Sequence, residues 1–252
     1  MTWDTQQSHE HSLRTLSLLD GFDDFKASIK HLADFGCGKG LDLEFFAHMR
    51  ELNEDGTPGR YLNINCVGFD LDAESNQGSR DNIKYKNWDL NTHKGTIWSV
   101  KFDLIWCHDV MQYLHSPINF LKFVNKNLNE GGMLYLGVPS TVNVLHHTFQ
   151  NYTPSGHLNT FTVTQLIYLL ALNGFDVKDF YINKHKYDDY IEAIVYKERD
   201  PLPSNTSWFE MVDMDILNEQ TKELVMGNNV LSDQGLTTLW LDGVVQDFRW
   251  HT

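Results

Sequence analysis

The stretch HLADFGCGKGLDLEFFAHMRE, residues 31–51, contains a short apolar run, three glycines and the beginning of a helix. Residues 32–35 predict the end of a buried strand. The residues after the glycines predict a helix whose apolar stripe is Leu41, Phe45, Met49 and Leu52. Glycines in the turn tolerate positive φ and leave backbone N–H groups open to a ligand; they are Gly36, Gly38 and Gly40. This unit is typical of α/β folds that bind a cofactor.

The spacing of the glycines distinguishes two kinds of cofactor site. Dinucleotide-binding folds favour G-x-G-x-x-G, in which the helix N-terminus binds a pyrophosphate. Here the order is G-x-G-x-G behind an acid, which suits a cation better than a diphosphate. The segment D-F-G-C-G-K-G resembles the first motif of the class I S-adenosylmethionine-dependent methyltransferases. The resemblance implies that the amino-acid end of S-adenosylmethionine is bound by Asp34, Gly36, Cys37, Gly38 and Gly40.

Two further predicted strands end in acidic residues. Residues 64–69, INCVGF, lead into Asp70, and residues 83–88 lead into Asp89. Parallel strands present their carboxyl ends at one edge of a sheet, so both carboxylates are expected near the glycine turn. The resemblance implies that Asp70 binds the ribose diol of the cofactor and Asp89 the adenine amino group. Neighbouring residues implied in the same site are Leu71, Leu90 and Cys107.

The distance from the glycine turn to Asp70 exceeds the roughly 20 residues that are usual between such a turn and the ribose-binding acid. A hydrophilic insert, NEDGTPGR at residues 53–60, accounts for the excess and is predicted to be a surface loop.

Strands and helices alternate through the rest of the first 200 residues. Strands are predicted at residues 101–107 and 132–138, and the helix between them has Ser116 as N-cap and Pro117 at its first position. A later helix has a capping-box pattern at Thr162 and a stop at Gly174. Two last strands, at residues 176–182 and 190–196, are joined by a polar segment short enough for an antiparallel hairpin.

This order predicts an α/β fold, a three-layer α/β/α sandwich with a mostly parallel seven-stranded sheet and an antiparallel last strand. The resemblance implies the same arrangement. We expect a methyltransferase domain at residues 31–198, preceded by an N-terminal helical cover at 1–30 and followed by a C-terminal helical appendage at 199–252. The N-terminal helix, residues 8–19, either covers the site or packs on the sheet edge. In the appendage, helices are predicted at 208–226 and 231–250.

Composition narrows the possible partners. The net charge of −14, from 20 basic and 34 acidic residues, disfavours binding to a phosphate backbone, so no nucleic-acid partner is expected. No signal peptide and no apolar run of about 18 residues is found, which predicts a cytoplasmic protein without a membrane partner. The three cysteines do not suggest a disulfide framework, and the histidines lack metal-binding spacing, so no metal is expected. The aromatic-rich appendage makes a homodimer a reasonable hypothesis.

The region CHDVMQYLHSPINFLKFVNKNLNEGGMLYLGVPS, residues 107–140, resembles the later motifs of the small-molecule branch of these methyltransferases. The resemblance implies that a small-molecule acceptor lies against a short helical turn after the fourth strand. His108 is the candidate general base. The candidate acceptor-side residues are Asp109, Tyr113, Tyr152 and His157. For each of them the alternative is a residue that shapes the pocket or makes a local hydrogen bond.

The expected reaction needs little from the protein beyond positioning, because a methyl group on a sulfonium is already activated. The protein must align the acceptor with the S–CH3 bond, exclude water and, where needed, remove a proton. Two alternatives remain at this stage. One is an NAD-dependent oxidoreductase, which the glycine spacing disfavours, and the other is an inactive S-adenosylmethionine-binding protein whose appendage binds a partner.

Overall fold

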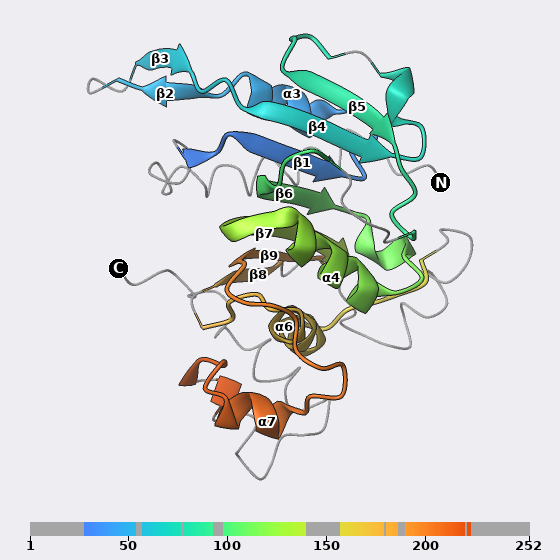
Figure 1. Cartoon of the computed structure of the whole chain (residues 1–252), viewed down its shortest axis with the longest axis vertical. Helices are drawn as coiled ribbons and strands as arrows, with labels where there is room; N and C mark the ends of the chain where they lie inside the picture. The colour runs from blue at the N-terminus through green and yellow to red at the C-terminus, as the bar shows by residue number, and fades with distance from the viewer. Residues whose placement is uncertain are drawn as a thin grey trace.

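The computed structural model describes residues 28–53, 57–76, 78–92, 98–139, 157–178, 180–185, 190–219 and 221–222. Seven strands form one sheet in the order β5-β4-β1-β6-β7-β9-β8 (Figure 1). Their bounds are β1 His31–Phe35, β4 Asn65–Asp70, β5 Ile83–Asn87, β6 Phe102–His108, β7 Leu128–Pro139, β8 Tyr181–His185 and β9 Tyr190–Tyr196. The first five are parallel, whereas β9 pairs antiparallel with both β7 and β8. The predicted seven-stranded sheet with an antiparallel last strand is confirmed.

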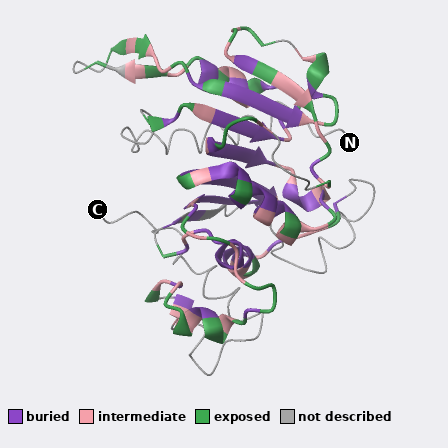
Figure 2. Ribbon diagram, in the orientation of Figure 1, coloured by how far each residue is buried: buried purple, intermediate pink, exposed green. Residues whose placement is uncertain are grey.

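Helices cover both faces of this sheet, which gives the three layers. Helix α3, Leu41–Ala47, packs on one face with the side chains of Leu32, Leu104 and Trp106. Helices α4, Pro117–Asn127, and α6, Val163–Leu172, pack on the other face (Figure 1). The central strands are buried along nearly their whole length, as Figure 2 shows, because their apolar side chains meet a helix layer on either side.

The helix boundaries follow from local sequence. Ser116 Oγ accepts the backbone N–H of Asn119 at 3.4 Å, and Thr162 Oγ1 accepts that of Gln165 at 3.1 Å. Gly174, at φ +84°, ends α6, since its own N–H and that of Phe175 bond to carbonyls of the last helical turn. The predicted N-caps Ser116 and Thr162 and the glycine stop are confirmed, whereas of the capping-box pattern the structure shows the Thr162 half.

Helix α3 differs from its prediction. It ends at Ala47, and the residues it buries are Leu43, Phe46 and Ala47. Leu41 and Phe45 of the predicted stripe are instead 40% and 37% exposed. Both sets have helical spacing, so periodicity alone did not distinguish them. The sheet surface against which α3 packs decides which set is buried.

The hydrophilic insert is also more ordered than predicted. Strand β2, Arg50–Leu52, pairs antiparallel with β3, Pro58–Tyr61. Leu52 therefore belongs to a strand and not to helix α3, and residues 58–60 of the predicted surface loop also belong to a strand. Arg50 donates to the Tyr61 hydroxyl at 2.5 Å, and its guanidinium lies 3.9 Å from the centre of that ring. The hairpin projects from the sheet as a mostly exposed arm (Figure 2).

Near the C-terminus, the strand predicted at 176–182 begins only at Tyr181. Val177 instead forms a bridge with Leu217, a residue of the predicted helix 208–226. That helix is short: α7 is Trp208–Asp213, and Asp215 follows with φ +56°. A left-handed residue interrupts the helical hydrogen bonds, so the chain turns back and lays Leu217 beside Val177.

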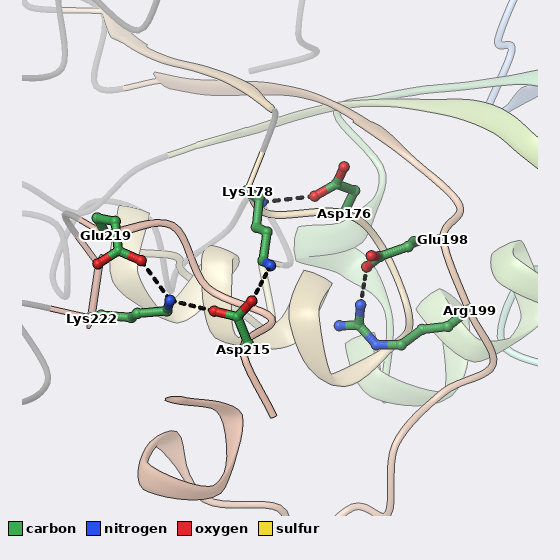
Figure 3. A network of polar contacts seen from close by, with 7 residues as sticks. All are labelled: Asp176, Lys178, Glu198, Arg199, Asp215, Glu219 and Lys222. Atoms are coloured by element: carbon green, nitrogen blue, oxygen red, sulfur yellow. Dashed lines mark hydrogen bonds and ion pairs between the residues drawn. The ribbon is translucent and has the colours of Figure 1, made fainter. Parts of the chain in front are cut away.

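One ion pair connects this returning segment to the residue that follows Val177, and two more lie within the segment. Asp215 contacts Lys178, at 2.8 Å, and Lys222, while Glu219 contacts Lys222 at 2.6 Å (Figure 3). The two lysines lower the pKa of Asp215 to about 2 through hydrogen bonds and charge. The start of the C-terminal segment therefore packs on the domain rather than extending away from it.

The predicted helices at residues 8–19 and 231–250, and Tyr152, lie outside the described residues. The division into 1–30, 31–198 and 199–252 stays a prediction.

Candidate active site

The glycine turn after β1 is built from left-handed backbone. Gly36, Gly38 and Gly40 have φ of +81°, +49° and +78°. The Gly36 N–H donates to the carbonyl of Phe69 at 2.7 Å, which ties the turn to the end of β4. A Cβ at Gly36 would lie 2.0 Å from Val110 Cγ2, and one at Gly40 would lie 2.1 Å from the Tyr85 hydroxyl. Both the left-handed backbone and the close approach of Val110 and Tyr85 therefore require glycine at these positions.

Asp70, at the end of β4, faces this turn. Its Oδ2 accepts the N–H of Gly38 at 2.9 Å, and its Oδ1 accepts the N–H of Leu71 at 2.7 Å. Asn76 supports the turn from the other side by donating to the carbonyl of Gly38 at 2.7 Å. A carboxylate oxygen has two lone pairs, so each oxygen can still accept a hydroxyl of a ribose diol. The backbone contacts hold the carboxylate in one orientation, which suits that role.

The residues after β5 offer a second acid at the same edge of the sheet. Asp89 is exposed, and its Oδ1 accepts the N–H of Asn91 at 2.9 Å, while the next residue, Leu90, is 6% exposed. Beside them, Trp88 Nε1 is buried and has no hydrogen-bond partner within the described part of the chain. Leu71 is exposed and Cys107 buried. A donor without a partner next to an exposed carboxylate fits a polar heterocycle such as adenine.

Asp34 is the acid inside β1 and is 4% exposed. Burial raises its pKa well above the ordinary value, and the nearby carboxylates of Asp42 and Asp70 raise it further. A cationic ligand near this carboxyl would relieve the penalty for ionising it. The electrostatics therefore fit the expected preference of the turn for a positively charged group.

Replacing Asp34 by asparagine is expected to stabilise the ligand-free protein at neutral pH. In the unfolded chain the carboxyl ionises near its ordinary pKa of 3.8, but the fold keeps the proton to higher pH. The free energy of unfolding of the unmodified protein therefore falls as the pH rises from 3.8 towards the raised pKa of the folded state. An amide side chain at this position has no such proton to lose. Thermal unfolding should show a higher Tm for Asp34→Asn at about pH 7 and little difference at about pH 3. An equal gain at both pH values, or the same gain from the exposed Asp81→Asn, would contradict this account.

The cysteines are chemically quiet. All three lie in the described part of the chain, are buried and form no disulfide: Cys37, Cys66 and Cys107. Burial, with the Asp34 charge next in order, raises all three thiol pKa values, that of Cys66 to about 12. Cys37 therefore contributes a small side chain to the turn and not a thiolate.

The candidate acceptor side begins where β6 ends. His108 is 6% exposed, and its Nδ1 lies 2.8 Å from the Tyr135 hydroxyl. Asp109 follows with φ +57°, a left-handed conformation that is uncommon for a residue with a side chain. Its Oδ1 accepts the hydroxyl of Tyr190 at 3.0 Å and the amide of Gln112 at 3.2 Å. Strained backbone and converging polar groups of this kind are frequent at functional sites.

Tyr113 and His157 also meet in space. Tyr113 ends the short helical turn η3, Met111–Tyr113, and its hydroxyl lies 3.0 Å from His157 Nε2. Burial lowers the pKa of His157 and raises that of Tyr113, so both are neutral near pH 7. His157 Nδ1 and Gln112 Oε1 are buried without a hydrogen-bond partner among the described residues. The predicted residues His108, Asp109, Tyr113 and His157 are thus brought to one end of β6.

Sequence reasoning missed three members of this cluster: Tyr135, Tyr190 and Glu192. The tyrosines are indistinguishable from core aromatics in an apolar strand. Glu192, in YIEAIVY, carried a usable signal, because a carboxylate inside a buried strand is rare without a specific partner.

The described residues show neither a metal-binding cluster nor a membrane-spanning helix. They hold no group of three His, Cys, Asp or Glu side chains that could bind a metal ion. Nor does this part of the chain contain a helix of the length and hydropathy that crossing a membrane requires.

Known proteins share this fold. One neighbour is a methyltransferase in complex with a methyltransferase activator from Haloferax volcanii, at TM-score 0.53 and 16% identity over 68% of this chain and 82% of that one. Another is an S-adenosylmethionine-dependent methyltransferase from Mesorhizobium loti. Its TM-score is 0.51 and its sequence identity 14%, over 67% of this chain and 90% of that one. A third is the magnesium protoporphyrin IX methyltransferase of Synechocystis with bound S-adenosylhomocysteine. Its TM-score is 0.50 and its sequence identity 12%, over 76% of this chain and 84% of that one.

At the level of sequence, no curated protein matches the chain. A family model described as a methyltransferase domain matches residues 11–179, about two thirds of the chain. These findings do not support an NAD-dependent oxidoreductase or an inactive cofactor-binding protein. The chain therefore belongs to the methyltransferase domain family and has the class I fold of S-adenosylmethionine-dependent methyltransferases.

Proposed function

We propose that this protein transfers a methyl group from S-adenosylmethionine to an oxygen, nitrogen or carbon atom of a small-molecule acceptor. The observation that carries the proposal is the single sheet edge at which the glycine turn, Asp70 and Asp89 follow successive strands, with the His108 and Asp109 cluster beside them. The bound S-adenosylhomocysteine of the Synechocystis neighbour supports the choice of cofactor. The net charge of −14 supports a small acceptor over a nucleic acid.

Each part of the site has a role in this proposal. The glycine turn and Asp34 would hold the cationic amino-acid end of the cofactor, Asp70 the ribose and Asp89 the adenine. When bound, the cofactor supplies a sulfonium-activated methyl group. The protein then orients the acceptor in line with the S–CH3 bond and excludes water, which accounts for most of the expected rate. His108 and Asp109 would take the acceptor's proton where one must leave.

The first test is calorimetric titration of the purified protein with S-adenosylmethionine, S-adenosylhomocysteine and NAD in parallel. We expect both sulfur compounds to bind with Kd values in the roughly micromolar range and NAD not to bind. Binding of NAD alone, or of none of the three, would overturn the assignment of the glycine turn. Transfer of a labelled methyl group to members of a small-molecule library then tests the reaction itself.

A further inference from the structure

Five polar side chains form a continuous chain from the acceptor side of the site into the core. Asp109 Oδ1 accepts from the Tyr190 hydroxyl at 3.0 Å, and that hydroxyl lies 3.1 Å from His108 Nε2. On the other side of the ring, His108 Nδ1 lies 2.8 Å from the Tyr135 hydroxyl, which donates to Glu192 Oε1 at 3.0 Å. The Asp109 side chain is 16% exposed, whereas the other four residues are at most 6% exposed. The Asp109 end of this chain of side chains therefore reaches solvent, whereas the Glu192 end is buried.

Strand register brings these residues to the same face of the sheet as α3. His108 of β6 is aligned with Gly137 of β7, and Gly137 with Glu192 of β9. A Cβ at Gly137 would lie 2.6 Å from His108 Nδ1 and 2.7 Å from the Tyr190 hydroxyl. The missing side chain at position 137 is what lets rings from three strands meet.

The hydrogen bond from Tyr135 to Glu192 constrains the tautomer of His108. An ionised carboxylate only accepts, so the Tyr135 hydroxyl gives its one hydrogen to Glu192. Its oxygen then accepts from His108, so the Nδ1 atom carries the hydrogen of the neutral ring. In a neutral ring the Nε2 atom then bears a lone pair directed at Tyr190, whose hydroxyl can turn its one hydrogen from Asp109 Oδ1 to Nε2. An acid that fixes a histidine tautomer through the opposite nitrogen prepares the other nitrogen to act as a base.

We propose that Asp109, Tyr190 and His108 form a proton relay that removes the proton of an O–H or N–H methyl acceptor, and that Tyr135 and Glu192 are positioning residues that hold His108 in the basic tautomer. This inference rests on the proposed function and extends it to acceptors that lose a proton on transfer.

The step balances in atoms and charge. The acceptor heteroatom bonds to the methyl carbon, the electron pair of the broken C–S bond stays on sulfur, and the acceptor's proton passes to Asp109. Tyr190 takes that proton as its own hydroxyl hydrogen moves to His108 Nε2. The positive charge lost at the sulfonium reappears on the imidazolium, which lies between Asp109 and the Tyr135 and Glu192 pair. After turnover, the proton leaves by the same path to solvent through the exposed side of Asp109.

The hydrogen-bond geometry accommodates both states. The Tyr190 hydroxyl has one hydrogen and two acceptors within reach, Asp109 Oδ1, to which it donates in the ligand-free structure, and the Nε2 lone pair of a neutral His108 ring. In the proposed step this hydrogen first turns from Asp109 to Nε2; after transfer the new hydroxyl hydrogen lies on the Asp109 side and Nε2–H donates to the Tyr190 oxygen. Both distances, 3.1 and 3.0 Å, are hydrogen-bonding distances, so the relay needs only a rotation of one hydroxyl hydrogen.

Nitrogen NMR of ligand-free protein labelled with ¹⁵N-histidine tests the relay without an acceptor. The chain has 12 histidines, so the His108 signals are identified by their loss in His108→Gln. We expect the Nδ1–H tautomer in the unmodified protein and a shift of at least about tenfold towards Nε2–H in Tyr135→Phe. The matched control is Tyr168→Phe, which loses one hydrogen bond to the carbonyl of Thr206 far from His108 in the chain. An Nε2–H tautomer in the unmodified protein, or equal spectra for Tyr135→Phe and the control, would overturn the relay.

Glu192→Gln provides a second variant that keeps the shape of the side chain. The amide oxygen still accepts from Tyr135, so the tautomer is expected to persist, but the loss of the charge should lower the pKa of His108 by about one unit. The charged or titratable groups in contact with His108 in this network are Asp109, Tyr135 and Tyr190, and only the charge at position 192 changes. An unchanged His108 pKa would exclude Glu192 as a positioning residue.

The NMR result and the S-adenosylhomocysteine titration together show whether the relay or the proposed function has failed. S-adenosylhomocysteine binding together with an Nε2–H tautomer overturns the relay alone. The Nδ1–H tautomer without any binding of S-adenosylhomocysteine overturns methyl transfer, and with it the role of the relay.

Discussion

Replacing Gly36 by alanine is expected to lower the free energy of unfolding by about 2 to 5 kcal/mol and to weaken S-adenosylmethionine binding at least about tenfold. Alanine at φ +81° pays a conformational cost, and its Cβ would lie 2.0 Å from Val110 Cγ2. Val110 sits directly after the relay residues, so relief of the clash also disturbs the acceptor side. Chemical denaturation and calorimetric titration measure the two effects.

Gly131 provides the matched control for this substitution. It has φ +69°, but a Cβ there meets no described atom within 4 Å. Gly131→Ala should therefore cost about 1 to 2 kcal/mol, the conformational part alone. The double variant Gly36→Ala with Val110→Ala should recover part of the loss, because the clashing methyl group is gone. Equal costs for Gly36→Ala and Gly131→Ala would show that contact with Val110 does not matter.

Asp70→Ala is expected to weaken S-adenosylmethionine binding by about 1.5 to 3 kcal/mol, a loss of roughly 10- to 150-fold, because a charge-assisted hydrogen bond to the ribose diol disappears. The structure adds a cost, since the carboxylate also accepts the N–H groups of Gly38 and Leu71. A lower Tm is therefore expected as well.

Asp70→Asn separates the two effects, because its amide oxygen can keep one backbone contact while the charge is lost. Its Tm should fall less than that of Asp70→Ala, while its affinity for the cofactor still falls. Asp72→Asn, an exposed acid two residues along, removes the same charge and should leave the affinity unchanged. If Asp72→Asn weakened binding as much as Asp70→Asn, the effect would be general electrostatics and not contact with the ribose.

Much of the structure of the candidate cofactor side was predictable because its signals are local. The glycine turn, the acid at the end of β4 and the caps of α4 and α6 each depend on residues a few positions apart. The choice of the buried face of α3 was not predictable, because Leu43 and Phe46 match the helical period as well as Leu41 and Phe45 do. A sheet surface assembled from distant segments selects between them.

On the candidate acceptor side, too, some features depend on local sequence and others on residues that are distant in the chain. The sequence predicted His108 and Asp109 as candidates, but it did not predict their hydrogen-bond partners, which lie far along the chain: Tyr190 is 82 residues from His108, and Glu192 is 57 residues from Tyr135. By itself, the sequence determined the order of elements, the left-handed turn and the acids at the strand ends, because backbone sterics and apolar periodicity act over a few residues. Only the tertiary structure decided which polar groups meet in the core, because strand register joins residues that no local pattern connects.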